Sequence, residues 1–259
     1  MDTVKKAINW KLFFILLAAS IITSLMIMPY IFALNPTVAK LFTPLVIAAQ
    51  AIQTVLLFSI TIFFGLFLAK RVGFGLPILE GALERKYMGA YLKSILGISI
   101  GSGIGAGILI VLLGFLFGDV SVSLFKTEAT SVARWKGFLA SFYGGITEEI
   151  LFRLFLTTFF VWVTLKIKKT QEGRPSSLGI WLSITLAALL FGLGHLPITS
   201  SLTAITPGVV LRAIILNGVG AIIFGWLYVK KGLEASIISH FSADIVLHVI
   251  LPVTISLLL

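Results

Sequence analysis

The chain contains no cysteine among its 259 residues. That absence excludes disulfide bonds, thiolate metal sites, palmitoylation and a cysteine nucleophile. Charge is also scarce: 12% of the residues are charged, against about 25% in an average soluble domain. Because 58% of the residues are hydrophobic, a water-soluble globule of this length could not bury its apolar surface. We therefore expect residues 1–259 to form a single integral membrane domain.

Long apolar runs occupy most of the chain. About 20 apolar residues are enough for a helix to span a bilayer. Runs of that length lie at residues 12–34, 41–69, 95–117, 137–165, 177–196, 208–229 and 234–258. Segment 71–94 could add an interfacial helix, and segment 197–207 could re-enter the membrane. The predicted fold class is an all-α polytopic membrane helix bundle, with about seven to eight transmembrane helices and a polar intramembrane cavity.

Basic residues outnumber acidic residues by 20 to 10. If the N-terminus is inside, fourteen of the basic residues fall in inner segments and four in outer segments. This bias follows the positive-inside rule, so we expect a cytoplasmic N-terminus, and the plasma membrane if the source is prokaryotic. The basic excess is then a topology signal. Membrane lipid is expected as a partner, and nucleic acid is not.

Ionisable side chains inside the apolar runs are few, and they gather in a motif-bearing core at about residues 137–250. Each costs roughly 2.5–3.5 kcal/mol or more at the centre of a membrane helix, so each is a functional candidate. These residues are Glu148, Glu149, Arg153, His195, His240, Asp244 and His248. Two further polar residues are expected to have structural roles. Arg212 should extend its side chain to the membrane surface, and Asn217 should hydrogen-bond another helix.

The fourth run carries two adjacent glutamates and one arginine. Glu149 and Arg153 are four residues apart, so they share a helix face and can form an ion pair. Glu148 is rotated by about 100° from Glu149 and can point elsewhere. An unpaired carboxylate in a site of low dielectric is suited to act as a general base. The alternative is a salt-bridged seam that only holds helices together.

The histidines lie in two further motifs. Phe191 and His195 are four residues apart, so the phenyl ring can pack beside the imidazole. His240, Asp244 and His248 follow one another at the same spacing and form one polar stripe. An aspartate in that position can orient an imidazole. A packing stripe between helices is the alternative, and it is the role we expect for His248.

These residue types suit the hydrolysis of an amide. A glutamate with a histidine can deprotonate water, and a second histidine with a hydrogen-bonding group can stabilise an oxyanion. The alternative is a metal site, in which a divalent metal such as zinc would be held by Glu148, His195 and His240. The zincin pattern HExxH is absent, so no cofactor is favoured. The GxGD pattern of membrane aspartyl proteases is absent as well.

Together the three motifs resemble the CPBP (Abi) family of intramembrane proteases, which includes the type II, Ras-converting CAAX prenyl protease. The matching positions are Glu148, Glu149 and Arg153 for EExxxR, Phe191 and His195 for FxxxH, and His240 and Asp244 for HxxxD. The resemblance implies an endopeptidase that cleaves near the C-terminus of a peptide or prenylated protein. The residues implied as catalytic are Glu148, His195, His240 and Asp244. Those implied as supporting are Glu149, Arg153 and Phe191.

Within this resemblance, Glu148 would activate water together with His195, and His240 with Asp244 would support the oxyanion or position the water. Asp244 departs from the prenyl proteases, which have asparagine there. A carboxylate donates a hydrogen bond only when it is protonated, so Asp244 could instead orient His240. The departure also favours the wider family, whose members include proteins linked to peptide maturation and bacteriocin immunity.

Two other functions remain as alternatives. A non-catalytic bacteriocin-immunity or peptide-binding protein could keep the polar cluster for structure. A proton- or ion-coupled transporter would be expected to show inverted repeats, and none is visible.

The rise of a helix per residue sets a geometric condition on the site. In straight, perpendicular helices, His195 would lie at the outer end of its span, away from Glu148 and His240.

Overall fold

The computed structural model describes residues 8–258. Within them, seven helical stretches are long and apolar enough to cross a membrane, which confirms the predicted all-α bundle. These stretches are Trp10–Leu34, Pro44–Val72, Gly89–Ser131, Arg134–Ile167, Ser177–Ser200, Pro207–Lys231 and Leu233–Leu257. Lys5 and Lys6, which contribute to the predicted orientation, lie outside the described residues.

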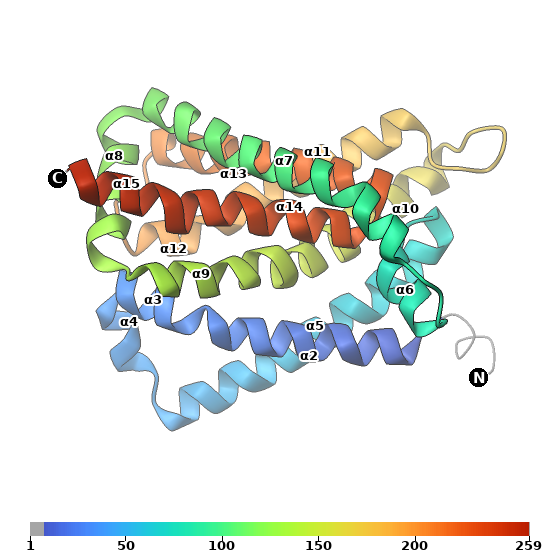
Figure 1. The fold of residues 1–259 in the computed structure, drawn as a ribbon, viewed down its shortest axis with the longest axis horizontal. Coiled ribbons are helices and arrows are strands. Elements are labelled where there is room, and N and C mark those ends of the chain that lie inside the picture. Colours follow the sequence, from blue (N-terminus) through green and yellow to red (C-terminus); the bar gives the residue numbers. More distant parts are fainter. Residues whose placement is uncertain (1–7, 259) are drawn as a thin grey trace.

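The first three stretches and their connections contain eight elements. They are α2 (Trp10–Met26), α3 (Met28–Leu34), α4 (Pro36–Leu41), α5 (Pro44–Val72), α6 (Pro77–Leu83), α7 (Gly89–Gly114), the short turn η1 (Phe115–Phe117) and α8 (Gly118–Ser131). The third stretch is too long for one straight span, and it breaks at Gly118, whose φ of +55° favours glycine. Helix α8 therefore starts a new direction at the end of α7 (Figure 1).

The last four stretches contain the motifs. Their elements are α9 (Arg134–Phe142), η2 (Tyr143–Glu148), η3 (Ile150–Thr157), α10 (Thr158–Ile167), α11 (Ser177–Gly194), α12 (Leu196–Ser200), α13 (Pro207–Lys231), α14 (Leu233–Ile245), η4 (Val246–Ile250) and α15 (Leu251–Leu258). Helix α14 runs through the middle of the bundle, with α7 and α13 on one side and α9 on the other (Figure 1).

The local sequence accounts for where the long helices begin and end. Asn9, Thr43, Ser176 and Thr206 stand just before α2, α5, α11 and α13, and each accepts a hydrogen bond from a backbone N–H of the first turn. These caps satisfy donors that the helix itself leaves free. Helix α5 ends at Gly73, whose left-handed φ of +80° terminates it without steric strain.

Short helices occur at the two connecting segments, 71–94 and 197–207, for which the sequence left the structure open. In segment 71–94, α6 is fixed to the start of α14, because Glu234 Oε1 accepts hydrogen bonds from the N–H groups of Ile78 and Leu79 at 3.0 and 2.9 Å. In segment 197–207, α12 extends α11 beyond His195 as far as Ser200. The apolar stretch therefore continues past His195 to Ser200, instead of ending at residue 196.

Glycines allow α7 to lie close against α14. A Cβ at Gly103 would collide with the carbonyl oxygen of Ser239, and one at Gly107 would lie 2.8 Å from Val246. The glycine series in this helix therefore serves helix packing on one face. Gly97, Gly101 and Gly105 face open space instead.

The fourth span has an unusual backbone around its motif. Residues 143–148 and 150–157 form wide, π-helical turns, in which hydrogen bonds run from residue i to residue i+5. Such turns are rare and are frequent at functional sites. Side-chain hydroxyls extend the pattern, since Thr157 and Thr158 donate to the carbonyl oxygens of Phe152 and Arg153. The EExxxR motif thus lies on a widened helix that turns its side chains towards α13 and α14.

Candidate active site

The centre of the polar cluster is Glu149, whose side chain is completely buried. Arg153 Nη1 lies 3.1 Å from Glu149 Oε1, so the ion pair expected from the four-residue spacing is present. The same oxygen accepts from His240 Nδ1 at 2.8 Å, and Ser236 Oγ donates to the other carboxylate oxygen. One carboxylate therefore links the fourth span to two side chains of α14.

Arg153 is a buried cation with several compensating contacts. Its guanidinium carbon lies 4.8 Å from the ring centre of Phe191 and 5.5 Å from that of Phe224. Its Nη2 donates to the carbonyl oxygen of Ala221 at 3.3 Å. An ion pair, two aromatic faces and a carbonyl group together offset the loss of water around the charge.

His240 is held by two aromatic rings and by a hydrogen bond at one of its ring nitrogens. Its ring stacks on Phe224 at 4.5 Å with an interplanar angle of 20°, and Phe191 meets it edge-on at 5.7 Å. Nδ1 is engaged by Glu149, while Nε2 faces Glu148 Oε2 at 3.8 Å and Asp244 Oδ1 at 3.6 Å. Glu149 is thus the residue that orients the imidazole at Nδ1, a contact that the sequence did not predict.

The two adjacent glutamates have different environments. The Glu149 side chain has 0% of its surface exposed, whereas that of Glu148 has 21% exposed. Glu148 lies near His240 Nε2 but has no arginine partner of its own among the described residues. The paired carboxylate is therefore enclosed, and the unpaired one is accessible.

Gly144 makes the close approach between the fourth span and α14 possible. A Cβ built there would collide with Asp244 Oδ2 and lie 3.3 Å from His240 Nε2. The position therefore admits only hydrogen, and this fixes how near the wide turns can come to the second histidine motif. Gly144, Ser236 and Phe224 contact site residues across helices, and none of the three was identified from the sequence. Ser236 stands four residues before His240 on α14, and this spacing is the signal that could have found it.

His195 joins the cluster through Phe191. Its ring lies edge-on to Phe191 at 4.7 Å, as the four-residue spacing predicted, and Phe191 in turn contacts His240 and Arg153. His195 Nδ1 lies 2.8 Å from the carbonyl oxygen of Phe191. A carbonyl oxygen only accepts hydrogen bonds, so Nδ1 carries the proton and a neutral ring has its lone pair on Nε2.

Polar residues outside the three motifs make specific contacts. Arg212 Nε donates to Ser121 Oγ on α8 at 2.6 Å, and its reach to the membrane surface stays a prediction. Asn217 Nδ2 donates to the carbonyl oxygen of Ala213 in its own helix, and not to another helix as expected. His248 Nδ1 lies 2.7 Å from Glu128 Oε1 and 3.1 Å from Tyr30 Oη, so it joins helices, as the expected packing role requires.

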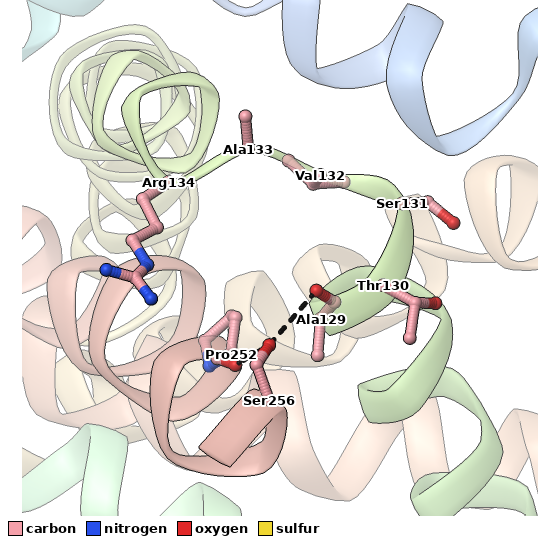
Figure 2. A pocket seen from close by; sticks show the side chains of 8 residues that line it. All are labelled: Ala129, Thr130, Ser131, Val132, Ala133, Arg134, Pro252 and Ser256. Carbon is pink, nitrogen blue, oxygen red and sulfur yellow. Dashed lines mark hydrogen bonds between the residues drawn. The ribbon is translucent and has the colours of Figure 1, made fainter. Parts of the chain in front are cut away.

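Two cavities occur away from the motifs. One, of about 390 Å³, lies where the end of α8 and the start of α9 pass α15, and there Ser256 Oγ donates to the carbonyl oxygen of Ala129 at 3.3 Å (Figure 2). The other, of about 480 Å³, is an apolar groove between α7, α11 and α13 with Trp181 and Trp226 in its wall. The motif residues line neither, so the polar cavity expected around them stays a prediction.

The metal alternative requires Glu148, His195 and His240 to converge on one ion. Within residues 8–258 no group of three or more histidine, aspartate or glutamate side chains is arranged to hold a metal ion. His240 Nδ1 is engaged by Glu149, and its Nε2 faces Glu148 Oε2 at 3.8 Å. A carboxylate at the other ring nitrogen is also usual for a histidine that binds a metal, so the metal alternative stays a prediction.

Comparison with known proteins gives one match. Residues 130–246 match the family model described as "Type II CAAX prenyl endopeptidase Rce1-like". The matched range contains all three motifs and is consistent with the CPBP family, so the resemblance found in the sequence is confirmed. No curated protein and no solved structure matches the chain.

Proposed function

We propose, from the premise that residues 130–246 are Rce1-like and of the CPBP family, that this chain is a CAAX-type intramembrane protease in which Glu148 activates water. The observation that carries the proposal is the contrast between two neighbouring carboxylates. Glu149 is enclosed by Arg153, His240 and Ser236, and Glu148 is accessible beside His240 Nε2. A general base needs a free lone pair and a route for water, and the lack of an arginine partner and the 21% exposure of the Glu148 side chain support that role.

His195 supports the same chemistry from α11. Because Phe191 fixes the proton on Nδ1, the other ring nitrogen is free to accept a hydrogen bond from water. A water held by Glu148 and His195 would have two acceptors for its two protons. One acceptor takes the transferred proton, and the other orients the attacking oxygen.

His240 is suited to stabilise negative charge on the substrate. With Nδ1–H donated to Glu149, a protonated His240 has one more proton to donate, on Nε2. A donor fixed by a buried carboxylate and two aromatic rings needs no rearrangement when an oxyanion forms.

The proposed reaction is a hydrolysis without a covalent intermediate. The water oxygen bonds to the carbonyl carbon while one water proton passes to Glu148, and the carbonyl π electrons move to the oxygen that His240 faces. When the tetrahedral intermediate collapses, the C–N bond breaks and Glu148 returns its proton to the leaving amine. The carboxylic acid that forms then gives its remaining proton to the amine, so one water is consumed, one carboxylate and one ammonium group form, and Glu148 is regenerated as a carboxylate.

The substrate class follows from the family. We propose a membrane-associated peptide or prenylated protein cleaved near its C-terminus. We also propose that the N-terminus is cytoplasmic, on the basis of the fourteen inner and four outer basic residues. No cofactor is part of the proposal.

The test is cleavage of a prenylated CAAX reporter peptide by purified protein in detergent. Glu148→Gln keeps the shape of the side chain and removes the base, so it should lower the rate by about 10²–10⁴-fold with unfolding unchanged. The matched control is Glu172→Gln, an exposed glutamate in the connection between α10 and α11, which should cleave at the wild-type rate.

Two further arms separate the alternatives. Cleavage that is lost with a chelator and restored by zinc would replace the glutamate mechanism by a metal-dependent one. If well-folded wild-type protein cleaves neither the prenylated peptide nor its unprenylated counterpart, the protease proposal fails. A binding or immunity role would then be favoured, because it predicts that Glu148→Gln leaves function intact.

A further inference from the structure

A second imidazole–carboxylate pair lies at η4, just past the end of α14 and beyond the matched motifs. His248 Nδ1 is 2.7 Å from Glu128 Oε1 on α8, and Tyr30 Oη lies 3.1 Å from the same nitrogen. Tyr30 also meets the imidazole ring edge-on at 5.3 Å. Side chains from three distant parts of the chain therefore fix the position of this histidine.

His248 is turned so that its other nitrogen faces the active site. Its Nε2 lies 3.9 Å from Asp244 Oδ1, one helical turn back along α14. The same oxygen of Asp244 lies 3.6 Å from His240 Nε2. Asp244 is buried, and its other oxygen lies against Gly144. One carboxylate oxygen thus stands between two imidazoles.

The carboxylates around Asp244 outnumber the arginine side chains that could neutralise them. Glu148, Glu149 and Asp244 all lie near His240, and Arg153 is committed to Glu149. A third carboxylate in a site of low dielectric would be costly without a partner. A neutral imidazole can donate a proton from only one nitrogen. A histidine with a carboxylate at each nitrogen is matched to both only as the doubly protonated cation.

We propose that His248, held by Glu128, is a positioning residue that neutralises Asp244 and fixes it beside His240. The inference rests on the proposed function, because it explains how an aspartate can work where the prenyl proteases have asparagine. An aspartate paired with a cation adds no net charge to the site. His248 would therefore be needed by an enzyme with aspartate at residue 244, and would be dispensable once that residue is neutral.

The test is a double-substitution cycle of Glu128→Gln with Asp244→Asn. Glu128→Gln keeps the side-chain shape and removes the charge that favours the cationic histidine. It should slow reporter cleavage by about tenfold in the wild-type background, as expected for coupling between contacting residues, and by less than about twofold in the Asp244→Asn background. A merely structural role would slow both backgrounds equally, and that result would overturn the proposal.

A second readout does not depend on catalysis. The midpoint of thermal unfolding should fall with Glu128→Gln alone and should fall less when Asp244→Asn is present. If the wild-type protein cleaves no reporter, the proposed function fails, and the unfolding midpoints alone test the pairing of His248 with Asp244. Midpoint shifts of the two substitutions that are not additive support the pairing. Additive shifts refute it. Should Glu128→Gln fold poorly, His248→Gln in the same two backgrounds replaces it with the same expected pattern.

Discussion

Two histidines on the last span share one pattern but lie in different surroundings. In each, Nδ1 contacts a carboxylate, Glu149 at 2.8 Å for His240 and Glu128 at 2.7 Å for His248. In each, Nε2 faces Asp244 Oδ1. The His240 side chain is only 6% exposed and is stacked on Phe224, whereas that of His248 is 29% exposed and has Tyr30 as its aromatic neighbour.

The comparison separates what the chemistry needs from what supports it. The inner pair, Glu149 and His240, lies beside the buried cation Arg153 and beside Glu148, the proposed base. The outer pair, Glu128 and His248, forms no ion pair with either of them among the described residues and lies next to the site at Asp244. A carboxylate–imidazole contact alone therefore does not mark a catalytic histidine, and the groups at its second nitrogen decide its role.

The largest expected effect is on the stability of the inner pair. Glu149→Gln leaves Arg153 without its counter-ion in a fully buried site, which should cost about 3–5 kcal/mol of unfolding free energy. Glu128→Gln, at a partly exposed glutamate, should cost clearly less. Thermal unfolding of both proteins in the same detergent measures the difference. Equal shifts would show that the inner pair is not the more strongly coupled one.

A second prediction concerns the contact that brings the fourth span to both pairs. Gly144→Ala adds a methyl group against Asp244 and His240, so the fourth span and α14 must move apart. Displacement of about 1 Å at a catalytic group lowers the rate on the order of 10²-fold. Gly101→Ala is the matched control, since its Cβ would meet nothing within 4 Å. If the two variants cleave the reporter equally well, the close approach at Gly144 is unimportant for catalysis.

A smaller effect is expected from the aromatic face of the inner imidazole. Phe224→Leu keeps the site apolar but removes the ring that stacks on His240, a contact worth about 0.5–1.5 kcal/mol. Unfolding should shift by that amount, and reporter cleavage should slow several-fold. Phe64→Leu, at an exposed position on α5, should change neither quantity. A Phe224→Leu protein with wild-type stability and rate would show that stacking does not hold His240.

The smallest effect is expected at the outer pair. Tyr30→Phe removes one hydroxyl from His248 Nδ1 and leaves Glu128 in place. The loss of one hydrogen bond costs about 0.5–1.5 kcal/mol, and the remaining partner should keep the cost at the lower end. Unfolding and cleavage measured together check this. A rate loss as large as that of Gly144→Ala would mean that Tyr30, rather than Glu128, holds the outer histidine.

The sequence predicted features that depend on one helix at a time. Hydropathy gave the number of spans, and four-residue spacing gave the Glu149–Arg153 pair and the Phe191–His195 contact. It could not predict that Glu149 meets His240, because that contact depends on how two helices are rotated about their axes. The Glu128–His248 contact joins residues 120 positions apart, and no local pattern marks it.

Helix rise also gave a misleading distance for the site. The expectation from the sequence assumed straight spans and a fifth span that ends at residue 196. Under that assumption, His195 lies near the outer end of its span. The chain instead continues through α12 to Ser200, and the fourth span widens between residues 143 and 157. Neither feature has a hydropathy signature, because both leave the apolar character of the segment unchanged.

The wide turns of the fourth span have a consequence for changes in chain length. A turn closed from residue i to i+5 holds about one residue more than an ordinary α turn. Deleting one residue between 143 and 148 would let the backbone tighten into a regular helix without breaking the span. The flanking faces would then keep nearly the same orientation, whereas the same deletion in a regular α-helix would rotate the downstream side chains by about 100°. The deletion would therefore remove the widened backbone that carries Glu148 without turning the rest of the span away from its neighbours.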